Sequence, residues 1–357
     1  MQRKATAQDV AKLAGVSRSA VSLVLNGHGD GNIASESQER IRRAAKELSY
    51  KPNAVALSLR NQQTRVIGIV SDRVISGPVD GNIIAGADAV AREKGFVTLG
   101  LDTEEDAQRD ASAVETLLDR HVDALMYVTV GLRELMVPTG MEKAPAILAN
   151  CFDSRGPGHL GSVLPDEVWG GAETVRHVLG AGHRRIAFLT GPVDHPAAQR
   201  RLEGHRFAFA AAGLPFPEDA VHPAGWDISD GFAAASAVLA ATAENRPTVL
   251  LCANDRCAVG AVLAARALGL DVPRDVSVVG YDDEERIADF MVPALSTMAL
   301  PLREIGAAAM TRLLAAVPGA RRKATAGLQP DRSGLAGEEL IRGRFVDRGS
   351  LGPVPPL

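Results

Sequence analysis

The stretch TAQDVAKLAGVSRSAVSLVLNG, residues 6–27, decides the fold of the N-terminal part of the chain. Thr6 and Asp9 form a T-x-x-D pattern, a variant of the capping box with which many helices begin. Gly15 is expected to end this helix, because glycine readily adopts the left-handed conformation that other residues resist. The residues that recur at the spacing of one helix face, and that we expect to be buried, are Val10, Leu13 and Ala14.

The second half of the same stretch predicts another short helix. Ser17 is a favourable N-cap, and the pair Asn26-Gly27 stops the helix. Two short helices joined by a turn that contains glycine describe a helix-turn-helix. The residues expected to face inward are Ala20, Val21, Val24 and Leu25. The residues expected to meet the major groove of DNA are Arg18, Ser19 and Ser22.

A third helix is predicted by SESQERIRRAAKELSY, residues 35–50, and would close a small three-helix core. Its apolar face consists of Ile41, Ala44, Ala45 and Leu48. Residues 1–65 carry a net charge of +6, which leaves −10 for the rest of a chain whose net charge is −4. A basic head on an acidic body indicates that the head meets a polyanion such as nucleic acid. A solvated, arginine-rich helix face is the alternative.

The composition of the 357-residue chain is that of a globular protein with two or three domains. The N-terminus lacks the apolar core of a signal peptide, and no apolar run approaches the ~20 residues of a membrane span. Cys151, Cys252 and Cys257 are too few and too irregularly spaced for a disulfide framework or a zinc site. We therefore expect a cytoplasmic protein that has no metal, no cofactor and no membrane contact.

From Arg65 onward, buried strands alternate with helices. The predicted strands are residues 66–70, 96–101, 123–128, 145–149, 185–191, 248–255, 276–283 and 296–299. The predicted helices are residues 82–94, 107–120, 132–136, 167–180, 199–212, 229–243, 256–268 and 301–316. The alternation favours parallel sheets with helices on both faces. Its restart after the fourth strand favours two similar lobes, which the last strand and helix would tie together.

Ligands of such sheets bind beyond the carboxyl ends of the strands, here in the cleft between the lobes. Asn254 and Asp282 lie at the carboxyl ends of two predicted strands, whereas Arg201 and Trp226 lie at or before helix starts. A tryptophan face near amide, carboxylate and guanidinium groups suits a polyol, because the ring stacks and the polar groups bind hydroxyls. The structural alternatives are a loop cap for Asp282 and a turn for Asn254. For Trp226 the alternative is the lobe core, and for Arg201 a surface pair with Arg200.

The pattern T-x-x-DVA-x-x-AGVS-x-x-x-VS-x-V-L-N, followed by Y-x-PN, resembles the DNA-binding head of the lactose-repressor (LacI/GalR) family of bacterial transcription regulators. GHRRIAFLTGP, PTVLLCAND, VSVVGYDD and ELIRGRFVDRGS resemble that family's regulatory domain in the same order. The resemblance implies a small all-α helix-turn-helix head and an α/β, two-lobed, periplasmic-binding-protein-like core with parallel sheets.

The resemblance also implies a domain organisation. The implied domains are the head at residues 1–50, a hinge helix and linker at 51–64, and an effector-binding and dimerisation domain at 65–357. Within the last domain, the first lobe is expected at about residues 65–160 and the second at about 161–290, with crossover segments to about residue 350.

The resemblance assigns functional residues to both parts of the chain. In the head, the residues implied to contact DNA are Thr6, Ser17, Arg18, Ser19, Ser22 and Asn26. In the second lobe, the residues implied to bind the effector are Arg201, Trp226, Asn254 and Asp282. In the first lobe, they are Ser71, Asp72, Tyr127 and Asn150.

The linker KPNAVALSLRNQQT, residues 51–64, contains a short stretch that is both apolar and helix-prone. A helix this short is unstable alone in water, so we expect it to form when two copies meet on DNA. An apolar side chain would then act as a wedge in the minor groove. The expected contact residues are Asn53, Val55, Ala56, Leu59 and Arg60. A plain tether is the alternative.

We therefore expect a homodimeric, nucleoid-associated repressor that binds a pseudo-palindromic operator in double-stranded DNA and responds to a small-molecule effector, a sugar, held between the lobes. The alternatives are a corepressor-dependent regulator and a soluble sugar-binding protein without DNA function. A body that also binds a protein partner is a further alternative. An enzyme that uses Asp282 and Asp283 is disfavoured, because adjacent strand residues point apart, and no catalytic residue is assigned.

Overall fold

The computed structural model describes residues 5–27, 29–50, 63–76, 81–156, 159–317 and 335–355. The chain divides into two compact units, residues 1–65 and residues 66–357, and each has a hydrophobic core of its own. Among the residues that the structure describes, no helix is long and apolar enough to cross a membrane.

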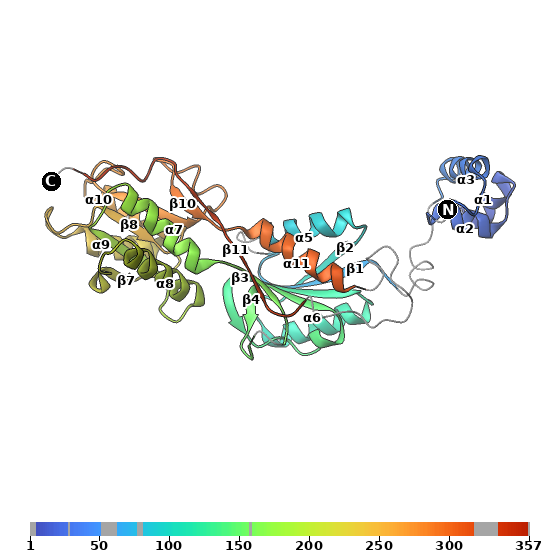
Figure 1. Cartoon of the computed structure of the whole chain (residues 1–357), viewed down its shortest axis with the longest axis horizontal. Helices are drawn as coiled ribbons and strands as arrows, with labels where there is room; N and C mark the ends of the chain where they lie inside the picture. The colour runs from blue at the N-terminus through green and yellow to red at the C-terminus, as the bar shows by residue number, and fades with distance from the viewer. Residues whose placement is uncertain are drawn as a thin grey trace. The chain divides into compact units, whose positions relative to one another are not determined.

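The first unit, here called the head, is a bundle of short helices (Figure 1). Its helices are α1 (Ala7–Ala14), α2 (Arg18–Leu25) and α3 (Ser35–Glu47). The predicted capping box is confirmed, because the Thr6 N–H donates to Asp9 Oδ2 at 2.8 Å and the Asp9 N–H donates to Thr6 Oγ1 at 3.3 Å. Gly15 follows α1 with a φ of 65°, and Ser17 Oγ caps α2 by accepting the Ala20 N–H at 3.1 Å. The local signals of the sequence thus determine where both helices begin and end.

The buried face of α1 differs from the prediction at Leu13. That side chain is 49% exposed, whereas Ala11 is buried in its place. Both α2 and α3 contact α1. The stripe facing them is centred near Ala14, with Val10 and Ala11 on either side of it, and Leu13 falls beyond its edge. The buried core of the head consists of Val10, Ala11, Ala14, Ala20, Val21, Val24, Ile41, Ala44 and Ala45.

The second unit, here called the body, contains two six-stranded sheets, and the first defines the first lobe. Its strand order is β11-β5-β4-β3-β1-β2, and the neighbours are parallel. The strands are β1 (Val66–Asp72), β2 (Val97–Asp102), β3 (Ala124–Leu135), β4 (Ala146–Asp153), β5 (Ser162–Pro165) and β11 (Glu338–Ile341). Helices α5 (Gly81–Glu93) and α11 (Leu302–Ala316) pack on the face that carries Ile69, and α6 (Ala107–Asp119) packs on the face that carries Val70.

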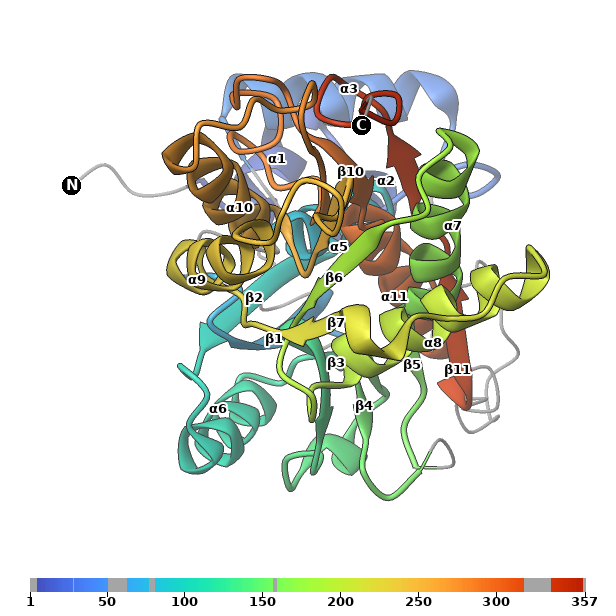
Figure 2. The ribbon, with the colours of Figure 1, turned by 90° about the vertical axis from the view of Figure 1, so that its left-hand side faces the viewer.

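The second lobe repeats this architecture with the strand order β12-β10-β9-β8-β6-β7. Its strands are β6 (Ile186–Thr190), β7 (Val221–Pro223), β8 (Val249–Cys252), β9 (Ser277–Asp282), β10 (Ser296–Ala299) and β12 (Arg344–Val346). Only the β10–β12 pairing of this sheet is antiparallel. Helices α7 (Glu167–Gly180) and α8 (Pro196–Ala211) cover one face, and α9 (Ile228–Leu239) and α10 (Asp255–Ala267) cover the other (Figure 2).

The chain crosses between the lobes after β5, after β10 and after β11. Pro165, Pro301 and Gly343, one from each crossing, line the same small hollow, so the three crossings lie together. Because β5 belongs to the first sheet, the first crossing follows Pro165 rather than residue 160. Strand β10 lies in the second lobe and α11 in the first, so the late segments connect the two lobes as the sequence predicts.

The helix predicted at residues 132–136 is wrong, because β3 continues as a strand to Leu135. Its pairing with β4 shifts between Val128 and Arg133, which leaves a bulge at residues 129–132. Gly131 adopts a φ of 67° within the bulge and resumes the strand on a new register. The segment is short, and pairing with β4 overrides its apparent helical pattern.

Reciprocal glycines let α5 and α11 cross in backbone contact. A Cβ on Gly86 would overlap the carbonyl oxygen of Arg303, and a Cβ on Gly306 would overlap that of Ile83. The pairs α7–α8 and α9–α10 use the same device, through Gly171 with Gly204 and Gly231 with Gly260. Since α11 arrives from the far end of the chain, this contact anchors the second crossing to the first lobe.

We predict that Gly306→Ala destabilises the body by about 1–3 kcal/mol, because the added methyl overlaps backbone that has no room to move. Gly180→Ala is the matched control, since Gly180 also lies in a helix but a Cβ there meets nothing within 4 Å. Urea unfolding followed by circular dichroism measures both variants. Equal stability of the two would contradict a structural role for the close crossing.

Candidate functional site

A cavity of about 180 Å³ lies between the two lobes of the body. The first lobe contributes Val130, Gly131, Leu132 and Asn150 to its lining. The second lobe and the crossings contribute Glu167, His195, Ala197, Arg201, Trp226, Asn254, Arg256, Asp282, Glu284 and Leu300. The structure thus brings together Asn150, Arg201, Trp226, Asn254 and Asp282 from the residues that the sequence nominates.

Arg201 of α8 and Glu167 of α7 form a buried ion pair at the base of the cavity. Arg201 Nε and Nη2 each donate to a Glu167 oxygen at 2.8 Å, and Nη1 donates to the Ala253 carbonyl at 2.6 Å. The Tyr281 hydroxyl donates to Glu167 at 2.7 Å, and its ring lies 3.6 Å from Arg201 Cζ. Burial acts to lower the pKa of Arg201, but the neighbouring Glu167 carboxylate, with smaller effects of Tyr281 and Asp282, raises it, so Arg201 stays charged.

Trp226 provides an aromatic wall in the loop between β7 and α9. A Cβ on Gly191 would overlap its ring, so glycine at that position makes room for it. The ring of His195 meets Trp226 edge-on with centroids 4.9 Å apart. Burial, and then the charges of Arg201 and Arg133, lower the pKa of His195. The wall is therefore uncharged at neutral pH.

Asn254 has both of the roles considered from the sequence. Its Oδ1 caps α10 by accepting the Cys257 N–H at 2.8 Å, and the residue also lines the cavity. Two residues along, Arg256 pairs with Glu284 at 2.9 Å. Both arginines of the lining are therefore already matched with carboxylates.

Two adjacent aspartates, the last residue of β9 and the residue after it, have different partners. Asp282 lines the cavity and lies 3.5 Å from Arg201 Nη2, whereas Asp283 pairs with Arg348 at 2.7 Å. Their φ values are 109° and 58°, a strained backbone of the kind often found at functional sites. The separation of the two carboxylates argues against a shared acid–base role.

In the first lobe, the structure brings only Asn150 to the cavity among the four nominated residues. Asn150 has a φ of 63°, and its Nδ2 donates to the Thr129 carbonyl at 3.2 Å. Its buried Oδ1 has no hydrogen-bond partner among the described residues. Asn150 also lines the cavity, so its amide group suits a ligand that carries hydrogen-bonding groups.

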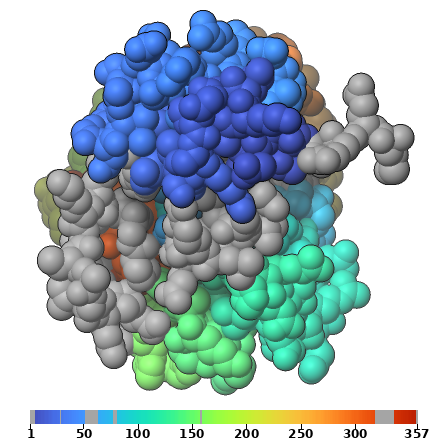
Figure 3. All heavy atoms as spheres, turned by 90° about the vertical axis from the view of Figure 1, so that its right-hand side faces the viewer, coloured from blue at the N-terminus to red at the C-terminus, as the bar shows by residue number. Residues whose placement is uncertain are grey.

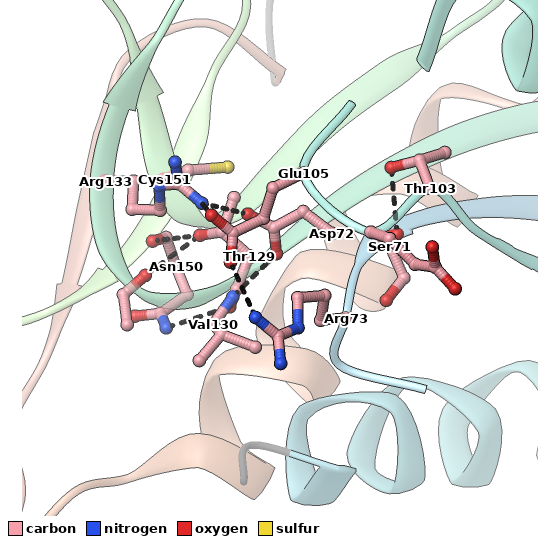
Figure 4. A network of polar contacts seen from close by, with 12 residues as sticks. Ser71, Asp72, Arg73, Thr103, Glu105, Thr129, Val130, Arg133, Asn150 and Cys151 are labelled. Atoms are coloured by element: carbon pink, nitrogen blue, oxygen red, sulfur yellow. Dashed lines mark hydrogen bonds and ion pairs between the residues drawn. The ribbon is translucent and has the colours of Figure 1, made fainter. Parts of the chain in front are cut away.

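Ser71, Asp72 and Tyr127 lie outside the cavity lining. The Tyr127 hydroxyl donates to Asp110 of α6 at 2.9 Å, so this side chain lies on the face of the sheet that α6 covers. Ser71 Oγ accepts the Ile75 N–H at 3.1 Å, and Asp72 binds Val130 and Arg133 (Figure 4). From the first lobe, the cavity is lined by Asn150 and by Val130 to Leu132 of the β3 bulge instead.

Several lining residues escaped the sequence reasoning. Glu167, Arg256 and Glu284 each lie within two residues of a nominated position or a crossing, so proximity to the strand ends was the available signal. His195 is the N-cap of α8. Val130 to Leu132 carried no signal, because they lie where the predicted strand at 123–128 gives way to the helix wrongly predicted at 132–136.

In the head, Arg18 and Ser19 are exposed on α2. Figure 3 shows the surface of the head in blue. Thr6 and Ser17 are used as helix caps, and Ser22 Oγ accepts from Asn26 Nδ2 at 3.1 Å. The exposed face of α2 also presents Leu23, which is 37% exposed. The expected hinge contacts lie outside the described residues, namely Asn53, Val55, Ala56, Leu59 and Arg60.

Comparison with known proteins finds a matching protein family for each of the two units. Residues 6–53 match bacterial regulatory proteins of the lacI family, and residues 175–333 match a periplasmic binding protein-like domain. The ribose operon repressor of Escherichia coli K12 is 34% identical over 316 residues, covering 87% of this chain and 92% of that repressor. The transcriptional repressor PurR of Aliivibrio fischeri MJ11 is 32% identical over 312 residues, covering 87% and 91% of the two chains. A lac repressor dimer bound to operator and the anti-inducer ONPF superposes with a TM-score of 0.75 at 27% identity, covering 98% and 100%.

A helix-turn-helix head combined with a two-lobed body that encloses a polar cavity defines a ligand-responsive, DNA-binding regulator. The chain belongs to the LacI family of bacterial regulatory proteins. The family and the fold class predicted from the sequence are thereby confirmed.

Asp255 forms buried hydrogen bonds beside the cavity, and their contribution to stability can be tested by varying the pH. It is fully buried, and it accepts from Thr297 Oγ1 and from the Glu284 N–H, each at 2.6 Å. Burial raises its pKa to about 7, although both hydrogen bonds oppose the rise. The folded state thus favours the neutral carboxyl. The resulting stabilisation is complete below the unfolded pKa of about 3.9 and is lost as the pH rises through about 7.

We predict that Asp255→Asn removes this pH dependence, because the amide stays neutral and the Thr297 hydroxyl can reverse to accept from it. The unfolding free energy of the variant relative to the wild type should rise with pH between about 5 and 7, by at most about 1.4 kcal/mol per unit. Urea unfolding at several pH values measures it, with the exposed Asp119→Asn as control. A constant difference across that range would contradict the assignment.

Proposed function

We propose that this chain is a transcriptional repressor that binds an operator as a homodimer and is controlled by a sugar held between its lobes. The observation that carries the proposal is the cavity itself. It is lined from both lobes by an aromatic face, amides and carboxylates, beside three crossings about which the lobes can move. A ligand that touches both lobes favours one arrangement over another, which is the requirement for allosteric control.

The charges of the lining favour an uncharged effector. Arg201 is engaged by Glu167 and Arg256 by Glu284, so neither guanidinium is free to neutralise an anionic ligand. Asp282, Asn150 and Asn254 line the cavity with a carboxylate and two amides, groups that bind hydroxyls. The proposed effector contacts are Asn150, Arg201, Trp226, Asn254 and Asp282.

The relatives support a sugar. One is a ribose operon repressor, and the similar structure of the regulator CelR, at 25% identity and a TM-score of 0.65, is a cellobiose complex. We extend this ligand class, and not either particular sugar, to the present chain.

The organisation we propose is a DNA-binding head at residues 1–50, a hinge at 51–64, and an effector-binding and dimerisation domain at 65–357. The proposed base and backbone contacts of the head are Thr6, Ser17, Arg18, Ser19, Ser22 and Asn26. The exposure of Arg18 and Ser19 on α2, the second helix of the motif, supports this. The hinge residues complete the proposal as minor-groove contacts.

We further propose that the protein acts in the cytoplasm, associated with the nucleoid, and that it binds ligands without transforming them. Its relatives are transcriptional repressors, which supports a role other than catalysis. Corepression, in which the effector strengthens operator binding, is the second candidate. A two-lobed body with a cavity between the lobes is compatible with either logic, so the architecture alone favours neither.

The DNA-binding half of the proposal predicts steep salt dependence. Fluorescence anisotropy with the gene's own upstream region should show affinity that falls sharply with salt, because phosphate contacts release counterions. Arg18→Ala should weaken specific binding by about 1–3 kcal/mol. Arg92→Ala, an equally charged change on an exposed body helix, should leave it unchanged. A flat salt response would overturn the proposal.

The effector half predicts that Asp282→Ala abolishes the response while operator affinity in the absence of effector is retained. Asp283→Ala, at the neighbouring residue that faces Arg348, is the matched control and should keep the response. Neutral mono- and disaccharides are first screened by tryptophan fluorescence, since Trp226 lies in the cavity wall. The active sugar is then tested for operator release. A normal response of the Asp282 variant would place the effector elsewhere.

A further inference from the structure

The bulge of β3 at residues 129–132 has two roles in the body. Three of its residues, Val130, Gly131 and Leu132, form the first lobe's wall of the cavity. Leu132 is 1% exposed and packs against Ala197 of α8 in the second lobe. A Cβ on Gly131 would lie only 3.9 Å from His195 Cε1, at the start of the same helix. The bulge is therefore both a ligand wall and a point where the lobes touch.

A bulge breaks the ladder of hydrogen bonds, so its backbone must be held by other groups. Asp72 at the end of β1 supplies them, because Oδ1 accepts the Val130 N–H at 2.8 Å and Oδ2 accepts from Arg133 Nη1 at 2.8 Å. Figure 4 shows Asp72 between these two partners. Thr129 Oγ1 adds a brace, since it lies 2.9 Å from the carbonyl oxygens of both Gly131 and Asn150.

We propose that Asp72 is a positioning residue of the effector cavity, which holds the β3 bulge in the shape that both faces the ligand and meets the second lobe. Its role then differs from the direct contact expected from the sequence, and for effector binding the inference rests on the proposed function. Moving the bulge would alter ligand affinity and lobe closure together.

The charges around Asp72 make this device sensitive to pH. Arg133 faces it from β3, Glu105 faces Arg133 at 3.2 Å, and Arg73 faces Glu105 at 3.7 Å. Tyr127 and Cys151, on β3 and β4, are near enough for the Asp72 charge to help raise their pKa values. Burial raises the pKa of Asp72 to about 7, against the opposing effects of Val130 and Arg133. Above that pH, the ionised carboxylate holds both partners, and below it the charge-assisted bonds weaken.

The test follows the bulge directly, in the full chain and without an effector. Hydrogen exchange measured by mass spectrometry reports the protection of peptides spanning residues 128–134, after correction for intrinsic rates at each pH. Wild-type protection is expected to fall about tenfold between about pH 8 and pH 6, the difference between a charge-assisted and an ordinary hydrogen bond. Asp72→Asn should be low and independent of pH.

Glu105→Gln is the matched control, because it removes a carboxylate on the exposed side of Arg133 and leaves Asp72 in place. It should keep a pH-dependent fall in protection, with the midpoint moved to lower pH because the Glu105 charge helps to raise the pKa of Asp72. Acrylamide quenching of Trp226 in a Trp169→Phe background gives a second readout, since Leu132 packs beside that ring. Quenching should increase in the Asp72 variant.

Equal bulge protection in Asp72→Asn and Glu105→Gln would overturn the proposal, and so would wild-type protection that does not change with pH. If Asp72→Asn does not fold, the wild-type pH series and Arg133→Gln, for which protection should also fall, decide the matter. Because neither readout requires a sugar, failure here leaves the proposed function intact. Failure of the sugar screen likewise leaves this inference standing.

Discussion

The buried ion pair between Arg201 and Glu167 organises the part of the second lobe that faces the cavity. Taking both charges out of water costs several kcal/mol each, and only complete hydrogen bonding can offset that cost. Glu167 receives two bonds from Arg201 and one from Tyr281, while the remaining guanidinium nitrogen binds the carbonyl of Ala253. The pair therefore fixes the ends of β8 and β9 and the starts of α7 and α8 in a single arrangement. Since α7 begins directly after the first crossing between the lobes, the same ion pair connects that crossing to the cavity.

That internal matching of charge decides what the cavity can recognise. An arginine that already serves a carboxylate contributes a fixed dipole and a flat surface rather than a free positive charge. The second lobe thus offers a polar surface with little net charge, and Trp226 adds an apolar face to it. Reciprocal glycines contribute indirectly, because the close crossing of α7 and α8 keeps Arg201 within reach of Glu167. Packing and electrostatics are therefore parts of one arrangement.

The sequence predicted the features that depend on local chemistry or on strand order. The Thr6–Asp9 cap, the Gly15 turn and the alternation of strands and helices follow from short-range rules, and Asn254 and Asp282 follow from their places at strand ends. Features that depend on tertiary geometry could not be predicted from the sequence. Leu13 is exposed because the angle at which α1 meets its neighbours selects Ala11 instead, and residues 132–136 are a strand because β4 pairs with them. Both reasons are tertiary contacts, which the local pattern of apolar and polar residues does not predict.

The first lobe shows why its own site residues were the hardest to predict. In the second lobe, side chains at the strand ends project into the cavity, so residue type and position suffice to nominate them. In the first lobe, the β3 bulge brings backbone and apolar side chains to the same place, and Asp72 turns to hold that backbone instead of the ligand. The two walls then have different consequences. Under the proposed function, polar side chains of the second lobe select the hydroxyl groups that fit, whereas the shape of the first lobe's wall sets how tightly the lobes close on them. On that proposal, a substitution near Asp72 changes the response to a ligand without changing which ligand is recognised.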